Sequence, residues 1–222
     1  MPVAGKVIRG IFDKGMYAFA DKDIGALKNL QGDAELIGYH ASPEKIVGDF
    51  RQSDVDLGTH FAASPELAVN ASIKSSQDKS SHYMDPIAYK FKIDAKPEQI
   101  TEIKHPGGRI DWLTIVEELN KSGKIPPDKM SEITNGLIDI EKSDNSFEDM
   151  MFKMNEFLKN KFSELDIKAI KYFNDFDSGP NWREMENIDS MEDLTELVQN
   201  HPVKPDYSYM VFDPSIVKKV EE

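Results

Sequence analysis

The sequence predicts an α+β fold in which short strands stand before and after a long helical block. Residues 87–95 alternate apolar and polar side chains, as a strand with one buried face does. Residues 112–165 instead repeat apolar side chains at helical spacing. Strands and helices do not alternate regularly, and no glycine-rich phosphate-binding signature is present, so a doubly wound nucleotide-binding fold is excluded.

The elements are expected in a simple order along the chain. Residues 1–35 show no long period and are interpreted as an N-terminal extension, in which Ile24, Leu27 and Leu30 indicate a short helix. Residues 36–222 are interpreted as one domain. Before the helical block we expect a strand ending at His40, a helix that starts at Pro65 and is capped by Ser64, and a strand at 87–95. After the block we expect a strand at 167–173, a helix at 191–198 and a closing strand at 207–212.

The helical insertion, at about 110–165, is expected to hold three helices. The first carries an apolar face from Trp112 to Leu119 and should end near Gly123, and Pro127 starts the second. Residues 145–146 offer caps for a third helix with a wide stripe of Phe and Met side chains. A Met-rich stripe can form an adaptable binding groove, but core packing is the favoured interpretation because Met fills gaps in cores.

The composition is that of an acidic chain without cysteine. Its 222 residues include 40 acidic and 27 basic side chains, for a formal net charge of −13, and 39% are hydrophobic. This charge disfavours non-specific binding to nucleic acid or to an anionic membrane, and it suits a basic protein partner. Without cysteine there is no disulfide framework, no thiolate nucleophile and no cysteine-type zinc site.

A cytoplasmic location is expected. No apolar run approaches the length of a membrane span, and residues 1–30 lack an uninterrupted apolar signal core. A route into a cytoplasm by phage or secretion machinery would leave no mark in the sequence.

Two polar clusters lie between residues 36 and 72. The first is Tyr39-His40-Ala41-Ser42, at the end of a short apolar run. The second is Gly58-Thr59-His60-Phe61, just before the helix that Ser64 caps. The order is therefore strand, His, loop, Gly, His-Phe and helix.

This order resembles the ADP-ribosyltransferase superfamily, most closely the ADP-ribosyltransferase-like domains of phage and polyvalent proteins. In that family a first strand ends in a histidine that binds a ribose of NAD, and here His40 matches it. A Gly-x-Tyr or Gly-x-His followed by Phe opens the segment that stacks on nicotinamide, which matches Gly58, His60 and Phe61. Residues 167–177 and 207–218 are similar to the far end of the family, including its closing strand.

The resemblance implies a split mixed or antiparallel sheet around an NAD cleft, with the helical insertion outside it. His40 and His60 would converge in that cleft. It also implies mono-ADP-ribosyl transfer from NAD to a host macromolecule, or NAD glycohydrolysis, in phage or bacterial conflict. NAD would be a substrate, and a protein would be the acceptor or partner.

The resemblance also gives roles to individual residues. His40 would hold a ribose hydroxyl, the backbone of Ala41 would meet the nicotinamide amide, and Ser42 would help to position the dinucleotide. His60 or Phe61 would provide the stacking face. The residues expected to bind NAD are Tyr39, His40, Ala41, Ser42, Gly58, His60, Phe61 and Ser208.

A carboxylate is needed, because cleavage of the nicotinamide–ribose bond develops an oxocarbenium-like cation. Many active family members carry a glutamate at the start of the closing strand, where this chain has Ser208. Phage-type members often place an acid after an Asn on the preceding strand, which favours Asp177 and then Asp175. Asp206, two residues before Ser208 on the same strand face, is a third candidate. The candidate catalytic residues are His40, His60, Asp177, Asp175 and Asp206.

Two functions stay open at this point. The histidines and Asp177 favour an NAD-dependent transferase. Ser208, and Ala41 in place of the family's glycine, favour a degenerate domain of the same fold that serves as a non-catalytic virion or interaction module. Other histidines show no ligand spacing, so no metal site is predicted; they are His82, His105 and His201.

Overall fold

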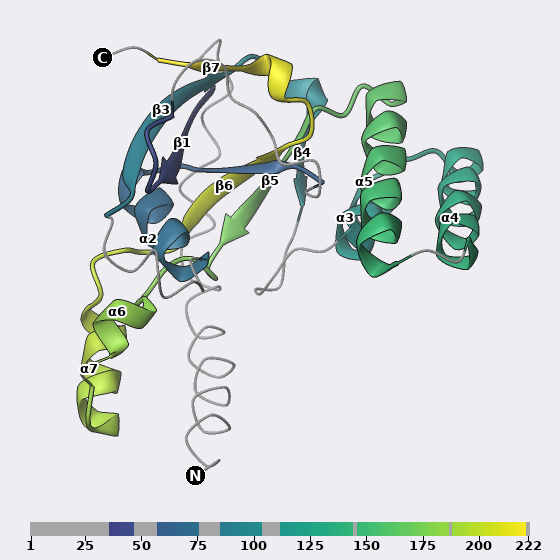
Figure 1. The fold of residues 1–222 in the computed structure, drawn as a ribbon. Helices are drawn as coiled ribbons and strands as arrows, with labels where there is room; N and C mark the ends of the chain where they lie inside the picture. The colour runs from purple at the N-terminus through teal and green to yellow at the C-terminus, as the bar shows by residue number, and fades with distance from the viewer. Residues whose placement is uncertain are drawn as a thin grey trace. The chain divides into compact units, whose positions relative to one another are not determined.

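The computed structural model describes residues 36–46, 57–75, 85–103, 112–143, 146–186 and 188–220. Within these ranges the chain forms a seven-stranded mixed sheet and six α-helices, which confirms the α+β class (Figure 1). Backbone contacts divide the chain after Glu35, and all described residues belong to the unit 36–222. The helix expected around residues 24–30 lies outside the described residues.

The sheet combines strands from both sides of the helical block. Its order is β4-β5-β6-β2-β1-β3-β7, and the neighbours are antiparallel except for β4 and β5. The strands are β1 (Leu36–Ser42), β2 (Thr59–Ala62), β3 (Ile87–Ile93), β4 (Ile100–Ile103), β5 (Ala169–Asn174), β6 (Asp206–Val211) and β7 (Val217–Lys219).

The sheet narrows to a seam between β1 and β2. β1 pairs with β3 along its whole length, and β2 pairs with β6 through each of its residues. Between β1 and β2, in contrast, the register holds one pair, Tyr39 opposite Ala62. Figure 1 shows these two strands crossing steeply. The halves β4-β5-β6-β2 and β1-β3-β7 are therefore joined over a short length.

Glycines permit close approach of the chain on both sides of β2, toward β1 at Gly38 and toward β6 at Gly58. A Cβ atom on Gly38 would lie 2.7 Å from the Cβ of Phe61, and one on Gly58 would lie 2.5 Å from the Cγ of Met210. Neither distance leaves room for a side chain. Close packing therefore explains the glycine at position 58, to which the resemblance gives a role in binding NAD.

Three helices separate β4 from the parallel strand β5: α3 (Trp112–Lys121), α4 (Pro127–Lys142) and α5 (Phe147–Glu164). Local signals set their ends. Gly123, at φ 73°, follows α3, and the Ser146 hydroxyl accepts a hydrogen bond from the Asp149 amide at the start of α5. These are the helices that the sequence predicts for the insertion.

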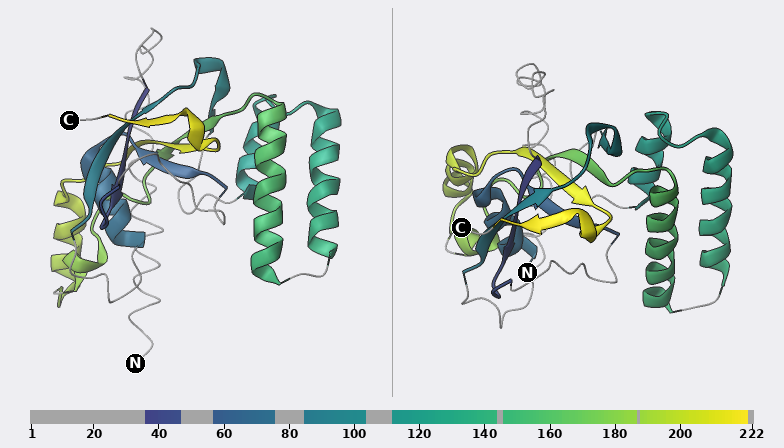
Figure 2. Two further views of the ribbon diagram at one scale, coloured as in Figure 1. Left: turned by 45° about the horizontal axis from the view of Figure 1, so that its top comes forward. Right: turned by 90° about the horizontal axis from the view of Figure 1, so that it is seen from above.

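The helical block lies beside the sheet (Figure 2). One hydrophobic core joins the helical block to the sheet. The Met and Phe stripe of α5 contributes Met154 and Phe162 to this core. These side chains of the stripe therefore serve core packing, the interpretation that the sequence favours. Further buried members are Ile115, Leu119 and Ile133 from the helices and Ile103, Ile170, Tyr172 and Met210 from the sheet.

The remaining surfaces of the sheet have separate apolar clusters. Phe61, Phe91 and Val211 pack together on the face opposite to the helical block. Helix α2 (Pro65–Ser75) covers Ala41 and Ala62 with one of its sides. Its start is capped by Ser64, whose hydroxyl accepts from the Leu67 amide at 3.2 Å.

Two further helices, α6 (Trp182–Met185) and α7 (Met191–Asn200), lie between β5 and β6. The Ser190 cap of α7 is as expected. Asn181 and Glu184 form a reciprocal capping box that starts the single turn of α6. Within the part of the chain that the structure describes, no helix is long and apolar enough to span a membrane.

Candidate functional site

Strands β5, β6 and β2 bring polar residues to one face of the sheet. Tyr172 lies opposite Ser208, and Ser208 lies opposite Ala62. Asn174 and His60 are each two positions along their strand from these pairs, and so they share the same face. Strand β6 therefore runs beside β5, the strand that leads to Asp177.

Hydrogen bonds connect these side chains into one network. Nδ2 of Asn174 donates to Oδ2 of Asp177 at 2.7 Å and to Oγ of Ser208 at 3.0 Å. Ser208 lies opposite Tyr172 in the sheet and its side chain acts on the pKa of the phenol, and the phenolic oxygen lies 2.6 Å from Nδ1 of His60. We call this set, from His60 through Tyr172, Ser208 and Asn174 to Asp177, the β5–β6–β2 network.

The environment of Tyr172 sets the protonation of its phenol. Burial, and secondarily the charge of Asp177, raise the pKa of Tyr172, so the phenol stays protonated at neutral pH. A phenol is both a donor and an acceptor, so Tyr172 can bond Nδ1 of His60 in either tautomer of that ring.

His40 and His60 do not share a pocket, contrary to the sequence-based expectation. His40 follows Tyr39, which pairs with Ala62, so its side chain points to the face of Phe61, and the two rings lie 5.8 Å apart. His60 precedes Phe61 and points to the other face. The two histidines are connected through the backbone instead, because Nδ1 of His40 lies 3.1 Å from the carbonyl oxygen of His60.

This contact sets the state of the His40 imidazole. Burial lowers the pKa of His40, and the hydrogen bond to the His60 carbonyl opposes that shift without cancelling it. The ring is neutral at pH 7. A carbonyl oxygen can only accept, so the proton is on Nδ1 and Nε2 is the acceptor nitrogen. A neutral acceptor of this kind suits a ribose hydroxyl.

The other residues expected to bind NAD have mainly structural surroundings. Phe61 is fully buried, with its ring 5.4 Å from that of Phe91, so its ring presents no stacking face at the surface. His60, which is exposed, can still offer one. Tyr39 and Ala41 pack under α2, and the Ser42 hydroxyl accepts from the Glu44 amide at 3.2 Å in a turn.

The three candidate acids have different environments. Asp177 is half-buried and belongs to the β5–β6–β2 network through Asn174. Asp206 lies opposite Asn174, and its Oδ1 accepts from the amide of Tyr207 at 2.7 Å. The backbone carbonyl of Asp175 accepts a hydrogen bond from the Ser178 hydroxyl at 2.7 Å. The hydrogen bonds thus join Asp177 to the His60 side of the sheet.

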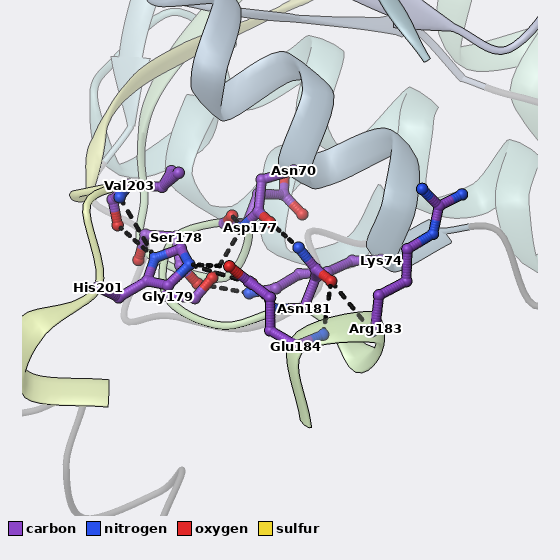
Figure 3. A network of polar contacts seen from close by, with 10 residues as sticks. All are labelled: Asn70, Lys74, Asp177, Ser178, Gly179, Asn181, Arg183, Glu184, His201 and Val203. Atoms are coloured by element: carbon purple, nitrogen blue, oxygen red, sulfur yellow. Dashed lines mark hydrogen bonds and ion pairs between the residues drawn. The ribbon is translucent and has the colours of Figure 1, made fainter. Parts of the chain in front are cut away.

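Helix α2 holds the loop that carries Asp177 (Figure 3). Nδ2 of Asn70 donates to the carbonyls of Asp177 at 2.6 Å and Gly179 at 2.8 Å. Nζ of Lys74, one turn further along α2, donates to the carbonyls of Phe176 at 3.0 Å and of Ser178. Sequence reasoning missed both residues. Their spacing of four shows that they share a helix face, but it does not show what that face contacts.

A second polar cluster lies on the other side of Asn70, also in Figure 3. Asn181 donates to Oδ1 of Asn70 at 2.9 Å, and Nε2 of the buried His201 lies 3.0 Å from Oε1 of Glu184. These residues, with Val69 of α2, line a surface cavity of about 360 Å³. Its lining includes neither the two family-like histidines nor Asp177.

No group of three or more His, Cys, Asp or Glu side chains is placed to hold a metal ion among the described residues. His201 pairs with Glu184, while His82 and His105 lie outside the described residues. Comparison of the chain with protein-family models, with curated proteins and with solved structures finds no match.

Proposed function

We propose that this protein cleaves NAD between nicotinamide and ribose and transfers the ADP-ribose to a host macromolecule or to water. The observation that carries the proposal is the β5–β6–β2 network. It joins His60 to Asp177 through Tyr172, Ser208 and Asn174, and so links three of the four segments that resemble ADP-ribosyltransferases. The first segment joins through the contact of His40 with the His60 carbonyl.

Asp177 is the group proposed to stabilise the developing cation. Its carboxylate is half-buried and fixed by the Asn174 amide, so it needs little reorganisation when positive charge appears on the ribose. Ser208, which replaces the family's glutamate, keeps a role in the proposal as the link between Asn174 and Tyr172.

The seam between β1 and β2 is the proposed place of NAD. One register pair joins the two halves of the sheet there, which supports the split-sheet arrangement that the resemblance implies. The neutral His40 would accept from a ribose hydroxyl on one side, and the exposed ring of His60 would offer the stacking face on the other. A basic host protein is the proposed acceptor, since the chain has a net charge of −13.

A second function is favoured by a specific observation. His40 and His60 point to opposite faces of the sheet, and Phe61 is fully buried. In a non-catalytic domain of the same general architecture, the β5–β6–β2 network would serve to fix three strands together, and the protein would act as a virion or interaction module.

The deciding experiment measures free nicotinamide after incubation of the purified full chain with NAD. We expect release by the parent protein and a loss of about 10²–10³-fold in Asp177→Asn, which keeps the shape of the side chain and removes its charge. Asp139→Asn, an exposed position on α4, is the matched control and should retain parent activity. Labelled NAD with a cell lysate then reports the acceptor. No release by the parent protein would leave the non-catalytic function.

A further inference from the structure

Four consecutive backbone carbonyls of the loop after β5 are held by two side chains of α2. The Lys74 ammonium group donates hydrogen bonds to the carbonyls of Phe176 and Ser178. The Asn70 amide donates to those of Asp177 and Gly179. The contacts bridge more than a hundred residues of sequence, and each side chain makes two of them.

The two side chains differ in charge, although they hold the same loop. Carbonyl oxygens beside a carboxylate create a negative potential, and an ammonium group offsets it in a way that a neutral amide does not. Asp177 and Glu184 of α6 are the acidic groups that face Lys74. Glu184 is paired with His201, and the neighbouring Arg183 is paired with Asp85 at 2.8 Å.

We propose that Lys74 is a positioning residue, whose ammonium group holds the carbonyls of Phe176 and Ser178 and thereby sets the place of the Asp177 carboxylate. The inference rests on the proposed function, in which Asp177 stabilises the developing cation. Asn70 secures the other two carbonyls at any pH, because an amide does not titrate. The loop therefore has one permanent support and one that depends on protonation.

The protonation of Lys74 is lost in a mildly alkaline range. Burial lowers the pKa of Lys74 to about 8, against the opposing attraction of Asp177 and Glu184. Above this pH the ammonium charge beside Asp177 disappears and the hold on Phe176 and Ser178 weakens. A displacement of a reacting group by about 1 Å can lower a rate by about 10²-fold, so the loop position matters for catalysis.

The first test observes the loop without any reaction. In ¹H–¹⁵N NMR spectra of the full chain, the amide resonances of residues 176–179 should titrate with a midpoint near pH 8. In Lys74→Met this titration should vanish, and the resonances should already be displaced at pH 7. Lys153→Met, an exposed position on α5, is the matched control and should keep the parent titration. Loop resonances that stay at their parent positions in Lys74→Met would overturn the proposal.

The second test uses nicotinamide release and chemical rescue. We expect activity to fall as the pH rises through about 8 in the parent protein, and to be about 10²-fold lower without that fall in Lys74→Met. In Lys74→Ala, added methylammonium should restore part of the activity, because it can donate to the vacated carbonyls. Tetramethylammonium has the same charge but no N–H group and should not restore it. Equal rescue by both cations would contradict a role through hydrogen bonds.

The two tests separate the inference from the proposed function. If the parent protein releases no nicotinamide but the loop resonances titrate with Lys74, the proposed function is rejected and the hold of Lys74 on the loop is supported. If the parent protein is active but the loop resonances do not respond to the loss of Lys74, the positioning role is rejected and the proposed function is supported.

Discussion

The phenolic oxygen of Tyr172 lies 2.6 Å from Nδ1 of His60, although the two residues belong to strands that are not neighbours in the sheet. The contact passes over β6, the strand between them, where Ser208 lies opposite Tyr172. A single buried tyrosine therefore links β5 to β2 across β6 and forms the centre of the proposed site.

Removing the Tyr172 hydroxyl should weaken both the fold and the site. In Tyr172→Phe the side chain of His60 loses a buried partner, so the free energy of unfolding should fall by about 1–3 kcal/mol. Denaturant unfolding measures this. Tyr207→Phe, whose hydroxyl makes a long exposed contact of 3.4 Å with Glu102, is the control and should change little. Equal stability of the two variants would show that the hydroxyl contributes nothing.

His40 can be tested for binding apart from its structural contact. In His40→Asn the amide nitrogen occupies the place of Nδ1 and can still donate to the His60 carbonyl, whereas the acceptor Nε2 is lost. We expect near-parent stability and a KM for NAD raised about fivefold, which corresponds to one hydrogen bond of about 1 kcal/mol. His40→Ala should in addition lower the melting temperature. An unchanged KM in His40→Asn would remove His40 from the NAD site.

Asp206 should be dispensable if Asp177 stabilises the cation. Asp206→Asn keeps an oxygen that can accept from the Tyr207 amide, so the fold should be retained. Nicotinamide release should stay within about twofold of the parent, against the loss of about 10²-fold or more expected for Asp177→Asn. The opposite order of the two rates would transfer the role to Asp206.

The stability of the protein should rise between about pH 8 and pH 10 because of Lys74. Its pKa is lowered to about 8 in the folded state from 10.5, so the unfolded chain binds more protons across this interval, and the free energy of unfolding increases with pH. Lys74→Met should lack this rise when both proteins are unfolded in denaturant at each pH. A rise of the same size in the variant would assign it to another group.

Above about pH 10 a different trend should follow. Burial raises the pKa values of Tyr172 and Tyr209 above the usual 10.0, so the unfolded chain releases these protons first, and stability falls as the pH increases further. The comparison of the parent with Lys74→Met is therefore cleanest below that range.

Helix limits could be predicted well because their signals are local. Ser146 and Ser190 accept hydrogen bonds from the first turns of α5 and α7, and Gly123 ends α3. The strands β2, β4 and β7 were not predicted, because each has too few residues to show a period.

The candidate site could be predicted in part. Alternation along β5 and β6 placed Asp206 on the face of Ser208, and the order of segments singled out His60 and Asp177. The same alternation puts His60 and Phe61 on opposite faces, which also separates His60 from His40 once Tyr39 is known to pair with Ala62. That pair is a tertiary fact, because no local period decides which residues of two strands meet.

Local sequence patterns are enough to predict the α+β class, the helical insertion and the polar residues at the ends of β1 and β5, since each depends on neighbours within a few positions. The contact of Tyr172 with His60, and the hold of Asn70 and Lys74 on the loop of Asp177, are visible only in the folded chain. Those partners lie a hundred or more residues apart, and packing of the sheet and α2 brings them together where no spacing in the chain records it.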